Sequence, residues 1–459
     1  MRHHDLVIIG TGSANGIIDE RFADWDVAVV EKGIGPNGAY GGTCLNVGCI
    51  PTKMFVHTAD VAAAPEEGAE LGVDLDLRDV RWREVRDRIF GRIDPISSGG
   101  RDHRVHENPN VTVYESTARF TAPGQLSVGG EAITGDRFVI AAGGRPVVPD
   151  VAGIGEVDYW TSDDVMRMDS LPESMIIMGT GFVGAEFAHI FSSLGVRVTV
   201  VGRSGQLLRA EDRDVAQRFT EIAERSWDVR LNRKEVSAEQ VGDRTRLNLE
   251  GPEGAETLEA EALLLAVGRR PNSDLLDVEA GGVRTDERGK VVVDAQQRAG
   301  EGVWSLGDIS SPHELKHVAN HEARVVQHNL LHPGEPTEVN HRFVPHAVFS
   351  SPQIAAVGIT EQEAQRRGVQ YVTATEDYAG IAYGWAMEDT TGFLKLLADP
   401  ATGQLLGAHV IGPQAPTVIQ PLVQAMSFGL DARSMARGQY WIHPAMPELV
   451  ENALLQLPL

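Results

Sequence analysis

Residues 41–53 read GGTCLNVGCIPTK and contain the only two cysteines of the chain, Cys44 and Cys49. A disulfide needs Cα atoms within about 4.4–6.8 Å, and residues five apart on a regular helix are farther apart than that. If the two sulfurs bond, the segment between them must leave helical geometry, and Asn46 and Gly48 tolerate such a backbone. Two unrelated buried thiols are the simpler interpretation of an arbitrary pair, but the rest of the chain favours a redox-active dithiol.

A glycine-rich loop, GTGSANG, occupies residues 10–16 directly after the apolar run at residues 6–9. Gly10 and Gly12 allow a tight turn and the close approach of a pyrophosphate to a helix N-terminus. We therefore expect a strand, a loop and a helix in that order. The third position of this fingerprint is Asn15 instead of glycine, which is a departure from the usual pattern.

Glu31 supports the same assignment because it follows the next apolar run, residues 27–30. A carboxylate at the end of the second strand can accept hydrogen bonds from a ribose hydroxyl. The N-terminal segment therefore predicts a βαβ unit that binds a dinucleotide.

A second unit of the same kind lies between the apolar runs at residues 175–178 and 196–201. Its loop keeps all three glycines of the fingerprint, which are Gly179, Gly181 and Gly184. Two such units in one chain predict two dinucleotides.

The second unit differs from the first at the end of its second strand. Residues 200–204 read VVGRS, so no carboxylate is present to accept a ribose 2′-hydroxyl. Arg203 and Arg209 can instead bind a 2′-phosphate by charge-assisted hydrogen bonds, although both could also be ordinary surface residues. We expect NADPH rather than NADH as the reductant.

Composition narrows the class of protein. The 65 acidic and 41 basic residues give a net charge of −24, which argues against nucleic acid or an anionic membrane surface as partner. No apolar run approaches the roughly 18 residues of a membrane-spanning helix. Two cysteines are too few for a structural disulfide framework, and we expect no metal site. Because an apolar run follows the N-terminus directly, we expect a cytoplasmic protein.

The length of 459 residues suggests about three domains. Proline-punctuated junctions at residues 144–146 and 268–271 are places where the chain can enter and leave an inserted domain. After about residue 340, strand-like stretches and a helical pattern at residues 419–430 indicate a separate α+β domain. The predicted fold is α/β, with two Rossmann-like dinucleotide-binding domains before the α+β domain.

With its motifs in this order, the chain resembles the flavoprotein disulfide reductases of the glutathione reductase and dihydrolipoyl dehydrogenase type. Cys44 and Cys49 match the redox pair of that family, and residues 141–146 match a flavin-domain crossover. Residues 302–308 (GVWSLGD) match the second flavin motif, and residues 443–448 (HPAMPE) match the C-terminal acid/base motif. The resemblance covers essentially the whole chain.

The resemblance implies two cofactors, FAD and NADPH, and assigns residues to each. The FAD-binding residues would be Gly10, Gly12, Ser13, Asn15, Glu31, Gly42, Thr43, Lys53, Ala142, Gly143, Asp308 and His317. The NADPH-binding residues would be Gly179, Gly181, Phe182, Gly184, Arg203, Arg209 and Gly268, with Phe182 as a gate over the nicotinamide pocket. The FAD-binding domain would comprise residues 1–150 and 271–338, the NADPH-binding domain residues 151–270, and the dimerisation domain residues 339–459.

The resemblance also implies a division of catalytic roles. We assign Cys49 to the flavin side as the charge-transfer thiolate and Cys44 to attack on the substrate disulfide. His443 would shuttle a proton, with Glu448 orienting its imidazole. In this family the histidine comes from the opposite subunit, so a homodimer with shared active sites is implied.

An ion pair of Lys53 with Glu186 near flavin N5 is implied by the same resemblance. As isolated residues, both would be ordinary surface charges, but each lies within a separate motif. A helix is expected to begin at residues 315–317, and its N-terminal dipole could stabilise negative charge near flavin N1.

The predicted substrate is the disulfide of a small thiol compound. Residues 17–21 (IIDER) stand where glutathione-disulfide reductases carry basic residues, so an anionic peptide disulfide is disfavoured. Residues 315–322, 383–389 and 438–444 resemble the branch of the family whose substrate is a largely uncharged pseudo-disaccharide disulfide.

Three alternative functions fit the sequence less well. A dihydrolipoyl dehydrogenase normally binds NAD and has an acidic residue where Gly202 stands, and a glutathione-disulfide-type reductase would need the basic residues just described. A non-catalytic flavoprotein is disfavoured because Cys44, Cys49, His443 and Glu448 are all present.

Overall fold

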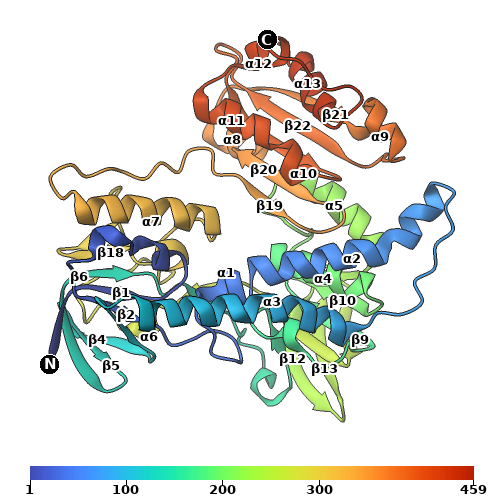
Figure 1. Cartoon of the computed structure of the whole chain (residues 1–459). Helices are drawn as coiled ribbons and strands as arrows, with labels where there is room; N and C mark the ends of the chain where they lie inside the picture. The colour runs from blue at the N-terminus through green and yellow to red at the C-terminus, as the bar shows by residue number, and fades with distance from the viewer.

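The computed structural model describes all 459 residues. Its first sheet region contains an eight-stranded sheet, formed by the N-terminal strands and two strands from residues 298–305 (Figure 1). The main path of the sheet runs β17-β18-β6-β1-β2-β3, and the hairpin β4-β5 continues from β6. β1 is parallel to both neighbours and fully buried at Leu6, Val7 and Ile8, as expected of a central strand. The strands are β1 (Arg2–Ile9), β2 (Val27–Val30), β3 (Val111–Tyr114), β4 (Ala118–Ala122), β5 (Gln125–Val128), β6 (Glu131–Ile140), β17 (Arg298–Gly300) and β18 (Val303–Ser305).

The helix expected after the first glycine-rich loop is replaced by two short 3-10 turns, Ser13–Ile17 and Glu20–Phe22. Asn15 and Gly16 have low helix propensity. The turn is held by the buried Arg104, which donates from Nε to Asn15 Oδ1 at 3.0 Å and from Nη2 to the Ile18 carbonyl at 3.2 Å. Hydrogen bonds from the Arg104 side chain thus hold this loop in place of the backbone hydrogen bonds of a regular helix.

The second βαβ unit forms as predicted from β9 (Ser174–Met178), α4 (Phe182–Ser193) and β10 (Arg197–Val201). These strands belong to a five-stranded parallel sheet with the order β11-β10-β9-β15-β8, beside the antiparallel sheet β12-β13-β14. The other elements here are β8 (Trp160–Thr161), α5 (Arg213–Ser226), β11 (Asp228–Arg230), β12 (Lys234–Val241), β13 (Arg244–Gly251), β14 (Gly254–Ala260) and β15 (Ala262–Leu265).

The two proline-punctuated junctions lie side by side. They form a two-stranded antiparallel sheet of β7 (Gly144–Pro146) and β16 (Arg269–Pro271). The chain therefore enters and leaves the second sheet region through one paired crossover, and α6 (Ser273–Leu276) comes directly after the exit.

Helix α2 (Cys49–Glu70) joins the two sheet regions. Phe55 of α2 stacks on Trp82 of α3 (Trp82–Asp102) with ring centroids 5.2 Å apart, and Trp82 contacts Phe191 of α4 at 6.2 Å. All three rings belong to the largest hydrophobic core cluster of the chain. A chain of aromatic contacts thus links the helix that begins at the second cysteine to α3 and, through Trp82, to α4.

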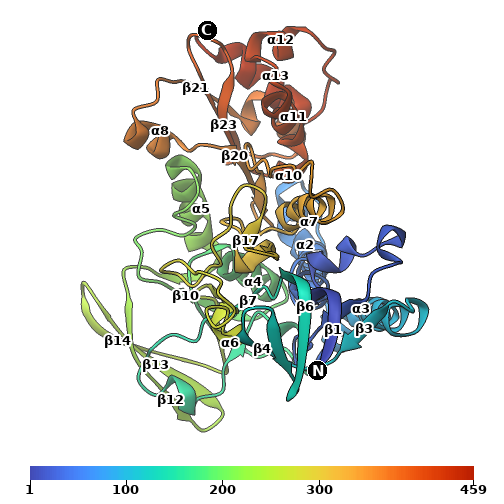
Figure 2. The same ribbon diagram turned by 90° about the vertical axis from the view of Figure 1, so that its left-hand side faces the viewer.

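The C-terminal part forms an α+β layer, which Figures 1 and 2 show above the two sheet regions, and Val348, Ile354, Phe393 and Ile411 join it to the largest hydrophobic core cluster. Its antiparallel sheet has the order β19-β20-β23-β22-β21 and packs against helices through a core of its own. The strands are β19 (His346–Val348), β20 (Ile354–Gly358), β21 (Val372–Asp377), β22 (Phe393–Ala398) and β23 (Leu405–Ile411). The helices are α8 (Glu361–Arg367), α9 (Ala382–Ala386), α10 (Ala415–Val418), α11 (Gln420–Phe428), α12 (Ala432–Arg437) and α13 (Pro447–Gln456).

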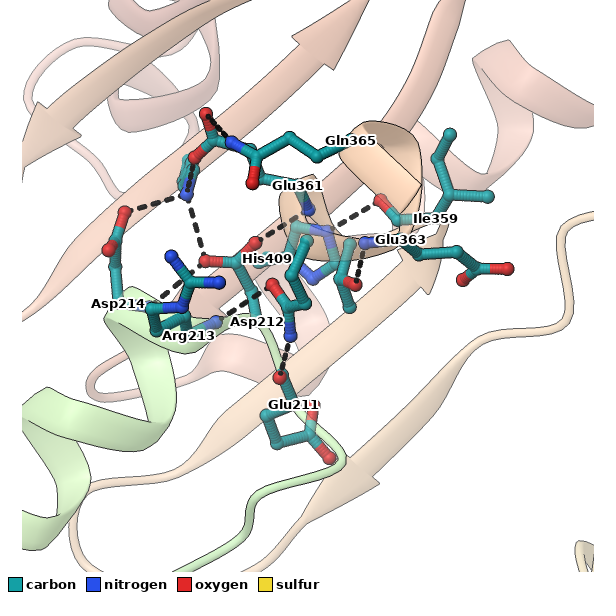
Figure 3. Close-up of polar contacts among 12 residues, drawn as sticks. Glu211, Asp212, Arg213, Asp214, Ile359, Glu361, Glu363, Gln365 and His409 are labelled. Atoms are coloured by element: carbon teal, nitrogen blue, oxygen red, sulfur yellow. Dashed lines mark hydrogen bonds and ion pairs between the residues drawn. The ribbon is translucent and has the colours of Figure 1, made fainter. Parts of the chain in front are cut away.

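A buried charge cluster holds the C-terminal layer against α5 (Figure 3). Lys395 of β22 is 3% exposed and donates to Asp212 at 2.9 Å, Asp214 at 2.6 Å and Glu361 at 2.5 Å. Asp212 also caps the N-terminus of α5 and accepts from the Glu361 amide. One lysine thus joins three carboxylates from two parts of the chain.

No helix of the chain combines the length and apolar character needed to cross a membrane.

Candidate active site

A cavity of about 600 Å³ lies where the first glycine-rich loop, the cysteine segment and the crossover meet. Most residues predicted from the first glycine-rich loop, the cysteine segment and the two flavin motifs line it. The predicted residues that line it are Gly10, Gly12, Ser13, Glu31, Gly42, Thr43, Cys44, Cys49, Lys53, Ala142, Gly143, Phe182, Glu186 and Asp308. The structure therefore brings together four motifs that are separated in the sequence.

Two predicted FAD-binding residues do not line the cavity. The Asn15 side chain accepts from Arg104 and from the Tyr40 hydroxyl, and the His317 ring bonds to the Pro345 carbonyl at 2.9 Å. The other predicted residues outside the cavity are Gly179, Gly181, Gly184, Arg203, Arg209, Gly268, His443 and Glu448.

The cavity walls fit a flavin dinucleotide. At Gly10, which has φ of +102°, a Cβ would lie 2.4 Å from the Ala141 carbonyl oxygen, and at Gly42 one would lie 2.7 Å from Gly12 Cα. Side chains at these two positions would collide with the neighbouring backbone, so glycine lets the loop, the cysteine segment and the crossover pack this closely around the cavity.

Two carboxylates face the same cavity. Glu31 accepts from the Thr11 and Gly33 amides at 2.9 and 2.8 Å, which fixes its position at the end of β2. Asp308 bonds to no donor of the chain, and its burial raises the pKa of its carboxyl. A ligand hydroxyl would satisfy this half-buried group, as the ribitol of FAD would.

The cysteine segment breaks its helix where the sequence predicts. Cys44 lies in the short helix α1 (Gly42–Asn46), and Cys49 is the first residue of α2. Asn46 holds the break by donating to the carbonyls of Tyr40 at 2.9 Å and Gly42 at 3.0 Å. Both cysteines are free thiols in this structure.

The two thiols differ in acidity. A hydrogen bond from Cys44 lowers the pKa of Cys49 to about 7, against the opposing effect of burial, and the Lys53 charge adds to the lowering. The same hydrogen bond, together with burial, raises the pKa of Cys44. Near neutral pH, Cys49 is therefore the more readily ionised thiol of the pair, whereas Cys44 keeps its proton.

Lys53 and Glu186 form an ion pair at the cavity wall. Lys53 Nζ lies 2.7 and 2.6 Å from the two Glu186 oxygens, and Nζ also stands 4.7 Å from the ring centroid of Phe349. Glu186 is 6% exposed and accepts a further bond from the Phe349 amide at 3.0 Å. The pair joins α2 to α4 beside the dithiol.

His443 and Glu448 form a second pair in the C-terminal layer. His443 Nδ1 lies 2.6 Å from Glu448 Oε1, and the imidazole side chain is 71% exposed. Glu448 is in the first turn of α13, which Figure 1 shows on the far side of the C-terminal layer from α1. Within one chain the histidine does not reach the dithiol.

The second glycine-rich loop has the close packing of a nucleotide cradle. At Gly179, with φ of +129°, a Cβ would lie 2.2 Å from the Ala266 carbonyl oxygen, and at Gly184 one would lie 2.3 Å from the Gly179 carbonyl oxygen. The loop opens α4 with Gly181 as its N-cap. Arg203 and Arg209 are exposed beyond the end of β10.

Two charged residues, Lys316 and Arg269, are among the cavity residues that sequence reasoning missed. Lys316, at the first position of α7 (Lys316–Leu331), donates to Ser13 Oγ at 3.0 Å, and the predicted start of this helix could have identified it. Arg269 bonds to Asp163 at 3.1 Å and to the Gly144 carbonyl at 2.8 Å. Its partners are distant in the sequence, so no local pattern marks them.

The Asp19 carboxylate of the IIDER stretch is paired within the chain. Asp19 bonds to Arg21 through both carboxylate oxygens and also accepts from Gln327 at 3.1 Å. None of these residues lines the cavity. Because Asp19 is already paired with Arg21, this stretch repels an anionic substrate less strongly than the sequence alone suggests.

The chain belongs to the pyridine nucleotide-disulphide oxidoreductases, a family of flavoprotein reductases that use NAD(P)H. Residues 4–323 match this family, and residues 344–454 match its dimerisation domain.

Within the family, the chain is a homologue of mycothione reductase. It is 52% identical to that enzyme from Mycobacterium tuberculosis strain H37Rv over 100% of both chains. It is 32% identical to dihydrolipoyl dehydrogenase of Haloferax volcanii over 98% of this chain and 96% of that one. The structure of the HOCl-induced flavoprotein disulfide reductase RclA from Escherichia coli superposes with a TM-score of 0.86, at 28% identity over 98% of this chain and 99% of that one.

Proposed function

We propose that the chain reduces mycothiol disulfide with electrons from NADPH, through FAD and the Cys44–Cys49 pair. The observation that carries the proposal is the thiol pair itself: two free cysteines that drive each other's pKa values apart on the wall of a cavity that fits FAD. Full-length similarity to mycothione reductase supports the choice of substrate. The segments at residues 315–322, 383–389 and 438–444 resemble the same branch of the family.

FAD would be held by the first glycine-rich loop, by Glu31 at the adenosine ribose and by Asp308 at the ribitol. When bound, FAD accepts a hydride from the nicotinamide and passes two electrons to a disulfide. Glu186 would fix the Lys53 ammonium at the cavity wall, where its positive charge favours negative charge on a neighbouring ring. We assign residues 1–150 and 271–338 to the FAD-binding domain and residues 151–270 to the NADPH-binding domain.

The two thiols would act in sequence. Cys44 gives its proton to His443 and attacks one substrate sulfur, which forms a mixed disulfide and releases the first thiolate, and His443 returns the proton to that thiolate. The Cys49 thiolate then attacks the Cys44 sulfur, which restores the Cys44–Cys49 disulfide and releases the second product as a thiolate that takes its proton from solvent. Cys49 lines the cavity and also a second, shallow pocket at the start of α2, so exposure does not decide which thiol faces the flavin. The assignment of Cys49 to the flavin side therefore rests on its lower pKa.

His443 would protonate the departing thiolate and would come from the second subunit of a homodimer. The dimerisation domain and the 71% exposure of this side chain support that arrangement, because a proton shuttle must reach the substrate sulfur. Glu448 would stabilise the imidazolium. Residues 339–459 would form most of the interface.

NADPH is the proposed reductant, with Arg203 and Arg209 at its 2′-phosphate. Gly202 supports this preference because a Cβ there would lie 2.1 Å from Thr180 Cγ2, so the site of the acidic residue of NAD enzymes is blocked. We propose the cytoplasm as the compartment, because a dithiol cycle needs a steady supply of reduced nicotinamide and free thiols.

The decisive measurement compares turnover of mycothiol, glutathione and lipoamide disulfides, each with NADPH and with NADH. We expect mycothiol disulfide with NADPH to give the highest kcat/KM. A preference for lipoamide with NADH would instead assign the chain to the dihydrolipoyl dehydrogenase branch. Purified protein that takes up no flavin would overturn the proposed route altogether.

The shared active site has its own test. Cys44→Ser and His443→Gln homodimers should each be nearly inactive. Refolding them together should restore about a quarter of the wild-type activity, because half of the dimers would be hybrids with one complete site. No recovery in the mixture, with hybrid dimers present by mass spectrometry, would exclude sharing.

A further inference from the structure

Arg203 is held by a buried carboxylate from a different sheet. Its Nε donates to Glu235 Oε2 at 2.7 Å, and Glu235 is 3% exposed whereas Arg203 is 62% exposed. The two residues lie 32 positions apart, on the loop after β10 and on β12. The sequence offers no sign of this contact.

The position of Glu235 is unusual for a carboxylate. It pairs across the sheet with Leu249 of β13, next to a register shift between Glu235 and Ser237. Leu249 and Ala238 belong to a buried apolar cluster on the same face. A carboxylate on such a face costs free energy unless a cation neutralises it, and Arg203 is the only cation that bonds to it.

The bond uses only one edge of the guanidinium. Nε is occupied, whereas Nη1 and Nη2 of Arg203 have no partner in the chain. Guanidinium groups bind phosphate through two parallel N–H bonds from one edge, so the remaining edge is suited to a phosphate. Ser204, the next residue, is fixed by bonds to Thr180 Oγ1 at 3.2 Å and to the Gln206 carbonyl at 2.7 Å.

We propose that Glu235 is a positioning residue for the 2′-phosphate of NADPH. It holds Arg203 by Nε so that the opposite edge of the guanidinium faces the nucleotide. The inference rests on the proposed use of NADPH and adds a specificity determinant to it. Glu235 does not contact the nucleotide, because its carboxylate is buried behind Arg203.

The physical benefit is pre-organisation. A free arginine side chain loses rotamer freedom when it binds phosphate, and that loss weakens binding. In this chain the bond to the buried Glu235 has already restricted Arg203 before the nucleotide arrives. The negative charge of Glu235 opposes the phosphate weakly, because the 62% exposed guanidinium of Arg203 would lie between the two anions.

Fragment binding tests the role without requiring turnover. 2′,5′-ADP carries the 2′-phosphate and 5′-AMP lacks it, and the dissociation constants of both can be measured by calorimetry on the flavin-loaded protein. Arg203→Ala should weaken 2′,5′-ADP by about 30-fold. Glu235→Ala should weaken it by about fivefold, and Glu235→Gln, which keeps an acceptor for Nε, should stay within about twofold of wild type. 5′-AMP should be unchanged in all three variants.

A double-mutant cycle separates positioning from a general structural effect. Glu235→Ala should add nothing in an Arg203→Ala background, because Glu235 acts only through Arg203. Glu256→Ala provides the matched control, since Glu256 of β14 pairs with Arg233 Nε at 3.1 Å in the same antiparallel sheet and should leave 2′,5′-ADP binding unchanged.

The outcomes distinguish this inference from the proposed function. If Arg203→Ala leaves 2′,5′-ADP binding unchanged, the proposed 2′-phosphate site is wrong and the inference fails with it. If Arg203→Ala weakens binding but Glu235→Ala does not, or tightens it, only the role of Glu235 is wrong. Equal weakening of 2′,5′-ADP and 5′-AMP by Glu235→Ala would likewise overturn positioning.

Discussion

Lys53 Nζ lies within 2.7 Å of both carboxylate oxygens of Glu186, which ties the helix that begins at Cys49 to the helix of the second nucleotide cradle. Glu186 is almost fully buried, and Lys53 is about one-third exposed. The contact therefore serves both the local electrostatics of the cavity and the packing of α2 on α4.

Lys53→Met should destabilise the protein and slow the reduction of its flavin. The substitution leaves a buried carboxylate without its cation, which costs about 2–3 kcal/mol, less than a fully buried pair because Lys53 is partly solvated. Urea unfolding and stopped-flow flavin reduction measure the two effects. Glu84→Gln, which breaks the exposed Arg81–Glu84 pair, is the control and should change stability by less than about 0.5 kcal/mol. Equal stability of Lys53→Met and wild type would show that the carboxylate is satisfied without the lysine.

The acidity of Cys49 should depend on Cys44. Because a hydrogen bond from Cys44 lowers the pKa of Cys49 to about 7, Cys44→Ala should raise it by about one unit, whereas Cys44→Ser keeps a donor and should change it less. Thiolate absorbance of each reduced protein, followed from pH 5 to 10, measures the shift. Identical titration curves for the alanine variant and wild type would rule out the hydrogen bond as the cause.

His443→Gln should separate the two halves of the catalytic cycle. Loss of the proton donor should slow disulfide turnover about 100-fold, because protonation of the departing thiolate contributes on that scale. Flavin reduction by NADPH should remain at the wild-type rate. His106→Gln, which alters another exposed histidine, is the control. An equal loss in both half-reactions would place His443 outside substrate protonation.

Features that depend on local chain geometry were predictable from the sequence. The break between Cys44 and Cys49 follows from their spacing and from Asn46 and Gly48, and the structure places Gly48 as the N-cap of α2. The second βαβ unit follows from apolar runs around a complete glycine fingerprint. The first unit was predicted less well, because Asn15 replaces the third glycine and no helix forms.

Long-range polar contacts were not predictable from local patterns. Arg104 reaches Asn15 from 89 residues away, and Lys395 reaches Asp212 from 183 residues away. Nothing near either residue distinguishes it from a solvated surface charge. Such pairings arise only when the tertiary fold buries a charge that then requires a partner.

The Lys395 cluster should make stability dependent on pH in the acid range. Burial alone would raise the pKa of Asp212, but hydrogen bonds from the Glu361 amide and from Lys395 hold it below its ordinary value of 3.8. The pKa of Glu361 is likewise below 4.5, because burial, which raises it, is outweighed by the bonds from Lys395 and Tyr371 together with the Lys395 charge. Carboxyls with lowered pKa values stabilise the fold above their unfolded pKa values. That contribution is lost as the pH falls below about 4.

Lys395→Met should therefore cost about 3 kcal/mol at pH 7, because it leaves the buried Asp212 and the partly buried Glu361 without a cation. The cost should shrink as the pH is lowered toward 4, since the unpaired carboxyls then take up protons. Urea unfolding of wild type and variant at several pH values between 4 and 7 measures the difference, with the exposed Lys234→Met as control. A difference that stays constant over this range would mean that Lys395 stabilises the junction through packing of its aliphatic chain and not through its charge.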